Sequence, residues 1–171
     1  MARLTRSLVV LVGMNLGMAH HAFADEADFL QQAKDRAEIE ALLWKYARAL
    51  ATYDEDAYAS VYTADGQFSA GGAATKGREA LKNMIVGLEQ GRATRTAAGE
   101  PNAPMYHMTA NHHIEFLGAD RARVHSYWLT VFGAAGEATP LRVAAAGHGI
   151  DELVRVDGRW LIESRNVRPQ D

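Results

Sequence analysis

The second half of the chain reads as four consecutive β-strands, and this succession limits the fold more than any other feature. The runs are rich in β-branched and aromatic residues and are separated by short turns. They span Met105–Leu117, Arg121–Phe132, Leu141–Val156 and Arg159–Val167. The Asp157-Gly158 pair before the last run is typical of a tight hairpin. Strands joined in this way pair with their sequence neighbours, so the pattern predicts an antiparallel meander.

The first half is helical in pattern. Apolar residues recur at helical spacing from Glu26 to Leu50 and again after Gly77, and Asp54 is a suitable N-cap for a short helix between these segments. Asp65-Gly66 predicts a turn into a strand, and residues 91–104 predict a mobile loop. The expected core positions are Ile39, Leu42, Leu43, Tyr46, Leu50, Leu81, Met84, Ile85 and Leu88. Helices first and a meander last predict an α+β domain with helices on one face and a small-molecule cavity inside.

The first 24 residues have the pattern of an export signal. Arg3 and Arg6 precede an apolar stretch that ends in the small-residue site Ala22-Phe23-Ala24. Thirteen mostly apolar residues are too few to span a bilayer. The sequence therefore predicts a signal peptide over residues 1–24, a single domain over 25–171, a periplasmic or secreted location, and no membrane association after cleavage.

Composition excludes several classes of function. The absence of cysteine rules out disulfides, thiolate nucleophiles and cysteine-bound zinc. A net charge of -3 without a dense basic patch argues against nucleic-acid binding. The chain has no phosphate loop, dinucleotide fingerprint or nucleophilic-serine elbow, and no His-x-His or His-Glu-x-x-His spacing. We expect neither a metal site nor a cofactor.

The stretch "MYHMTANHHIEF", residues 105–116, concentrates three histidines in one predicted strand. Regular alternation puts His107 on a polar face, with Asn111 and His113, away from the more apolar face that carries His112 and Ile114. A β-bulge near residues 109–111 would reverse this parity and turn His107 toward the core. The sequence leaves both arrangements open. Histidine titrates near pH 6.5, so an inward His107 is a candidate acid or base.

Five segments in order carry a resemblance to a known family. "EIEALLWKYARAL", "DEDAYASVYTADGQF", "KGREAL", "YHMTANHHIEFLGADRARV" and "DELVRVDGRWLIESR" resemble the SnoaL-like branch of the nuclear transport factor 2-like superfamily. The resemblance implies a cone in which helices cover a curved, mostly antiparallel sheet and enclose a pocket. Relatives include scytalone dehydratase, dehydrochlorinase and ketosteroid isomerase, and also members without catalytic activity. Fold alone therefore does not fix the function.

The resemblance also implies site residues. The family's catalytic histidine, in the pattern His-x-x-x-Asn, falls on His107, with Asn111 following it. The aspartate that orients this histidine in the dehydratases falls on Ala51, so this chain departs from the family pattern. Asp54 is the nearest carboxylate along the chain, and Tyr53 or Tyr46 offers a hydroxyl instead.

Other residues are candidates on pattern alone. His148 lies between two glycines on a long predicted strand and shares a face with Ile150, which is expected to line the cavity opposite His107. Tyr46, on the inward helix stripe, is a candidate donor to a developing oxyanion. Trp128 and Trp44 are candidates for the cavity wall, although buried aromatic residues more often serve packing.

Two functions follow from these residues. The first is a cofactor-independent lyase, dehydratase or isomerase that uses His107 for acid–base chemistry on a small apolar or aromatic molecule. The second is a small-molecule-binding or accessory protein without chemistry, which Ala51 in place of the aspartate favours. With either function, an exposed sheet face predicts a homodimer or homotrimer.

Overall fold

The computed structural model describes residues 13–134 and 140–168, with side chains from residue 26 onward. The chain divides into two compact units, Met1–Ala37 and Glu38–Asp171, and each is described by itself. In the first unit the described backbone is helical, and Gln31 donates a hydrogen bond to Asp35 at 2.9 Å. Half of the predicted export signal lies outside the described residues, so the signal stays a prediction. No described helix combines the length and apolar character needed to cross a membrane.

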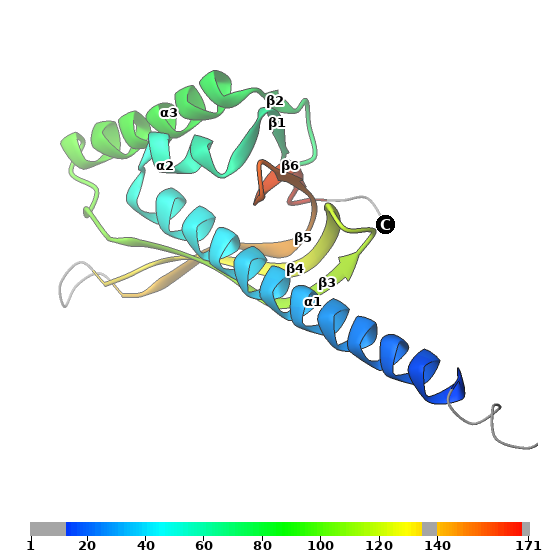
Figure 1. The fold of residues 1–171 in the computed structure, drawn as a ribbon. Coiled ribbons are helices and arrows are strands. Elements are labelled where there is room, and N and C mark those ends of the chain that lie inside the picture. The colour runs from blue at the N-terminus through cyan, green and yellow to red at the C-terminus, as the bar shows by residue number, and fades with distance from the viewer. Residues whose placement is uncertain (1–12, 135–139, 169–171) are drawn as a thin grey trace, which may run out of the picture. The chain divides into compact units, whose positions relative to one another are not determined.

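The larger unit combines helices with one six-stranded sheet (Figure 1). In chain order the described elements of both units are α1 Gly13–Thr52, which begins in the first unit, α2 Glu55–Ser60, β1 Tyr62–Ser69, β2 Thr75–Lys76, α3 Arg78–Ala97, β3 Met105–Phe116, β4 Arg121–Phe132, β5 Arg142–Val156 and β6 Arg159–Asn166. The strand order is β2-β1-β6-β5-β4-β3, and every neighbouring pair is antiparallel except β1 with β6. The predicted α+β class and the predicted meander are both confirmed.

The four long strands begin and end within one residue of the predicted bounds. Turn chemistry explains this agreement. Asp157 and Gly158 both have positive φ, 50° and 74°, which is the conformation that a two-residue hairpin between twisted strands requires. β5 and β6 pair from Val156↔Arg159 onward, directly beside this turn.

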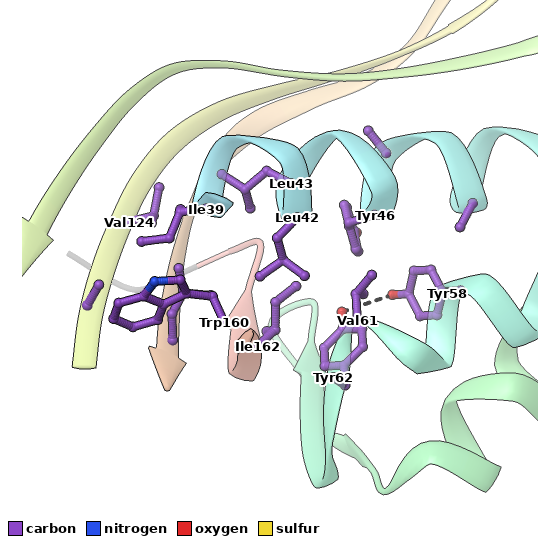
Figure 2. Close-up of a cluster of buried hydrophobic side chains, with 14 of the residues drawn as sticks. Ile39, Leu42, Leu43, Tyr46, Tyr58, Val61, Tyr62, Val124, Trp160 and Ile162 are labelled. Carbon is purple, nitrogen blue, oxygen red and sulfur yellow. Dashed lines mark hydrogen bonds between the residues drawn. The ribbon is translucent and has the colours of Figure 1, made fainter. Parts of the chain in front are cut away.

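One stripe of α1 supplies much of the helical part of the core (Figure 2). Ile39, Leu43 and Tyr46 are buried against side chains that include Val124 of β4 and Ile162 of β6. Their spacing of three and four residues keeps them on one face of the helix. Trp44 lies off this stripe and is 69% exposed, so it is not a core residue.

The two shorter helices agree with the sequence only in part. Asp54 caps α2, because its carboxylate accepts a hydrogen bond from the Ala57 amide at 2.8 Å. The predicted loop over residues 91–104 is wrong in its first half, since α3 continues to Ala97. Its Arg, Ala and Thr residues sustain a solvent-facing helix without apolar periodicity. Leu81 and Ile85 of α3 are buried as expected, but Leu88 is 46% exposed.

The predicted turn at Asp65-Gly66 is a bulge inside β1. Tyr62 pairs with Ile162 and Gln67 pairs with Ser164, so β1 has more residues than β6 over the same length. The lack of a side chain at Gly66 allows the close backbone approach at this bulge. A Cβ at Gly66 would lie 2.9 Å from the Tyr62 Cβ and 3.0 Å from the Ile162 carbonyl oxygen.

We predict that Gly66→Ala destabilises the protein by about 1–3 kcal/mol, because the added methyl overlaps backbone that cannot move aside. Gly87→Ala is the matched control. Gly87 lies within α3, and nothing lies within 4 Å of its added Cβ. Alanine there raises helix propensity and is expected to stabilise the protein by about 0.5–1 kcal/mol. Urea unfolding of the two variants measures both changes, and an equal response at the two positions contradicts the explanation.

Candidate functional site

An open groove of about 780 Å³ lies between α1 and strand β3. One wall comes from α1 and the others come from β3, β4 and the start of β5. The groove is lined by Glu40, Trp44, Ala47, Arg48, Ala51, Tyr106, His107, Met108, Thr109, His112, Leu129, Val131, Leu141 and Val143. Apolar walls with a few polar groups are typical of sites for small organic molecules.

A bulge in β3 brings His107 into this groove. Ala110 pairs with Tyr127 and His113 pairs with His125, so β3 contains one more residue than β4 between these pairs. Asn111 sits at the bulge with a φ of 54°. The inward positions are His107 and Thr109 before the bulge and His112 after it. Of the two arrangements left open by the sequence, the bulged strand is therefore the correct one.

The His107 ring is fixed on three sides. Its Nδ1 lies 2.9 Å from the Thr130 hydroxyl, which belongs to the residue directly opposite on β4. The ring stacks on Trp128 at a centroid distance of 6.2 Å and meets the edge of Tyr46 at 5.7 Å. Its Nε2 is buried and has no hydrogen-bond partner among the described residues. One ring nitrogen is thus held, and the other is uncommitted.

The surroundings of His107 keep it neutral. Burial, and to a lesser extent the nearby Arg165 charge, lower its pKa to about 4. His112, also in the groove, has its pKa lowered mainly by burial, and its Nε2 lies 3.1 Å from the Thr109 hydroxyl. At neutral pH the His107 imidazole is therefore uncharged. One of its ring nitrogens carries a hydrogen, and the other can accept a proton.

A buried ion pair lies in the interior behind His107. Arg165 of β6 and Asp151 of β5 are almost fully buried, with Nη1 and Oδ2 separated by 2.6 Å. The Arg165 guanidinium also covers the Tyr46 ring at 4.1 Å. Burial raises the pKa of Asp151 to about 6, even though Arg165 acts in the opposite direction. Neither Arg165 nor Asp151 stood out in the sequence.

This interior contains further uncommitted polar atoms. Within the described part of the chain, Arg165 Nε and Nη2, Asp151 Oδ1 and Ser126 Oγ have no hydrogen-bond partner. Buried polar groups are normally satisfied by protein, water or ligand. Burial also raises the pKa of Tyr46, so its phenol stays protonated at neutral pH.

The structure brings together three of the predicted site residues, His107, Tyr46 and Trp128, through direct ring contacts. Of these three, His107 lines the groove, whereas Tyr46 is buried behind it and Trp128 lines a different hollow. Trp44 also lines the groove and is largely exposed. Ala51 also lines the groove, at the position where the family pattern has aspartate.

Several predicted site residues lie elsewhere. The expectation for His148 and Ile150 is wrong, because the buried positions of β5 in this region are Gly149 and Asp151. His148 pairs with the exposed Tyr127 and lines a different hollow. Asp54 is exposed and is occupied in capping α2, so it does not orient His107.

Two more candidates are also outside the groove. Asn111 is exposed at the bulge, where its role is to take the positive φ. Tyr53 has a φ of 57° after α1, and its ring lies under the Arg92 guanidinium at 5.2 Å. Neither residue lines the groove that contains His107.

Residues 31–166 of the chain match the family model of the SnoaL-like domain. The chain belongs to the SnoaL-like family. No protein of curated function matches this SnoaL-like chain significantly.

Three solved structures illustrate the fold of this SnoaL-like protein. A protein of unknown function from Mycobacterium tuberculosis is 25% identical over 81% of this chain and 73% of its own, with a TM-score of 0.66. A protein from Novosphingobium aromaticivorans, proposed to be a scytalone dehydratase, is 23% identical over 82% of this chain and 87% of its own, with a TM-score of 0.64. A nuclear transport factor 2-like protein with a cystatin-like fold, from the same organism, is 19% identical over 84% and 86%, with a TM-score of 0.67. The last two likenesses concern the fold, and they confirm the predicted fold family.

We predict that His107 titrates with a pKa near 4 when its ring protons are followed by NMR. Because its pKa is lower in the folded protein than in the unfolded chain, the neutral form favours folding. This contribution, on the order of 2–3 kcal/mol, is full above about pH 6.5 and is lost as the pH falls toward 4.

His107→Gln removes this dependence. The raised pKa of Asp151 gives an opposite slope between about pH 4 and 6, and it is present in both proteins. The difference between wild type and variant in the pH dependence of urea unfolding therefore isolates His107. A difference that is flat across this range would show that the ring is solvated in the folded state.

Proposed function

We propose that this SnoaL-like protein is a cofactor-independent lyase or isomerase in which His107 transfers a proton of a small, largely apolar molecule bound in the groove. The observation that supports this most directly is that the two ring nitrogens of His107 have different environments. Nδ1 is held by Thr130, whereas Nε2 is buried and finds no partner in the described part of the chain. Such a fixed, neutral imidazole beside an apolar groove has the properties of a general base.

Thr130 takes over one part of the task that an aspartate has in the family pattern. When Nδ1 carries the proton, it donates to the Thr130 oxygen, and this leaves the Nε2 lone pair free. A hydroxyl orients the ring but adds no negative charge, so it does not stabilise the imidazolium as a carboxylate would. The low pKa of His107 fits this exchange.

The charge of Arg165 supports the other half of a proton transfer. Removal of a proton next to a carbonyl group moves the C–H electron pair onto the carbonyl oxygen and leaves an anion. The Arg165 charge that disfavours the imidazolium favours such an anion, and it acts through space because Arg165 is buried outside the groove lining. Return of the proton to another carbon gives an isomer, and departure of a neighbouring leaving group gives elimination. The likeness to a protein proposed to be a scytalone dehydratase agrees with elimination of water.

A second candidate function is binding without chemistry, and Ala51 is the observation that favours it. Ala51 lines the groove and offers no functional group. A pure binding protein needs the apolar walls but not the proton affinity of His107. The two functions are separated by comparing turnover with affinity in the same variants.

We predict that His107→Gln abolishes turnover in a screen of small aromatic alcohols and carbonyl compounds, with a loss of at least about 10²-fold, while ligand affinity changes little. Thr130→Val, which keeps the shape and removes the hydroxyl, is expected to lower kcat about tenfold or more and to leave KM nearly unchanged. Thr130→Ser is its matched control and should retain most of the activity. If the compounds bind but His107→Gln turns over as fast as wild type, the protein is a binding protein or uses another base.

A further inference from the structure

A second hollow, of about 550 Å³, lies between the C-terminal part of α3 and the adjacent ends of β4 and β5. Three arginines line it, Arg92, Arg95 and Arg142. Among the lining residues that the structure describes, Glu100 is the one carboxylate. We call this site the basic hollow. A concentration of like charges around one concave surface is unfavourable unless an anion compensates it.

Aromatic rings and an amide hold two of the guanidinium groups without neutralising them. Arg92 lies over the Tyr53 ring at 5.2 Å and donates to Asn102 Oδ1 at 2.6 Å. Arg142 lies over the Phe132 ring at 5.0 Å. Stacking fixes the plane of a guanidinium and leaves its N–H edge available, which is the arrangement that Arg uses to bind planar anions.

Two carboxylates form ion pairs with arginines of the basic hollow but do not hydrogen-bond to them. Arg92 Nη2 lies 3.7 Å from Glu89, and Arg95 Nε lies 3.7 Å from Glu100. Both distances exceed that of a hydrogen bond. Arg92 Nε is buried and has no acceptor within the described residues. The basic hollow therefore has uncommitted charged donors as well as a positive potential.

The basic hollow adjoins the His107 groove, because Leu141 lines both. An apolar group packed against Leu141 would thus contact the lining of both sites. We propose that the basic hollow binds the carboxylate of the substrate, so that the substrate class is a small apolar or aromatic carboxylic acid. The link to the substrate rests on the proposed function, whereas carboxylate binding itself does not.

The guanidinium donors of the basic hollow fit a carboxylate group best. Two coplanar oxygens match two parallel N–H groups of one guanidinium, and the apolar surface of Phe132 and Leu141 suits the carbon skeleton next to the acid. A phosphate group shares the charge and the oxygens, so inorganic phosphate is a necessary comparison.

The test is titration of the full-length protein with benzoate, followed by NMR of the arginine side-chain Nε–H groups. Wild type, Arg95→Gln and Arg142→Gln are compared with Arg159→Gln. Arg159 is exposed at the start of β6 and lies outside both hollows. Its variant is therefore a control that changes the net charge by the same amount without altering the basic hollow. Methyl benzoate provides a ligand of the same shape without the charge.

We predict that benzoate shifts the Nε–H signals of Arg92, Arg95 and Arg142 and that methyl benzoate does not. Arg95→Gln and Arg142→Gln are each expected to weaken benzoate binding about tenfold, the effect of losing one charge-assisted hydrogen bond, whereas Arg159→Gln leaves it unchanged. Since Arg95 and Arg142 are exposed, the variants should unfold at the wild-type temperature.

Three outcomes would overturn the inference: no shift with benzoate, an equal loss in Arg159→Gln, or tighter binding of inorganic phosphate than of benzoate. Failure of the carboxylate-site inference can be told apart from failure of the proposed function. Benzoate binding in the basic hollow with no turnover of any carboxylic acid would refute the catalytic role of His107 and leave the anion site standing.

Discussion

The ion pair between Arg165 and Asp151 is the interaction on which the rest of the structure depends. It joins β5 to β6 in the centre of the sheet, and both partners are buried. Removing one partner would leave an uncompensated charge, a change that typically destabilises a protein by about 3–5 kcal/mol. The pair also places a fixed cation on the face of Tyr46 and close enough to affect His107. A neutral imidazole and a permanent positive charge thereby share one interior, and the proposed proton transfer rests on this combination.

Most of the fold could be predicted from the sequence, because the signals are local. Period-two alternation and turn residues such as Asp157-Gly158 set the strands to within a residue. The spacing of Ile39, Leu43 and Tyr46 gave the buried face of α1. The end of α3 was missed because a helix with solvent on most sides needs no apolar periodicity, so its last turns look like a loop.

The site was less predictable, because strand irregularities decide which side chains point inward. His107 faces the groove only because β3 has an extra residue at Asn111. Arg165 is buried because β6 has an extra residue at Glu163, between the pairs Glu152↔Ser164 and Leu153↔Ile162. Bulges depend on the partner strand as much as on the bulged one, so the sequence of a single strand does not fix them. The same limitation explains why His148 was assigned to the wrong face, and why Thr130 was not recognised as the partner of His107.

The bulge at Asn111 has a further consequence, because β3 is a border strand of the sheet. A straight border strand offers a continuous row of amide and carbonyl groups to any other extended chain, which is the usual start of aggregation. The left-handed residue interrupts that row in the middle of a strand of 12 residues. One inserted residue therefore turns the histidine inward and, at the same time, protects the rim of the sheet from uncontrolled pairing.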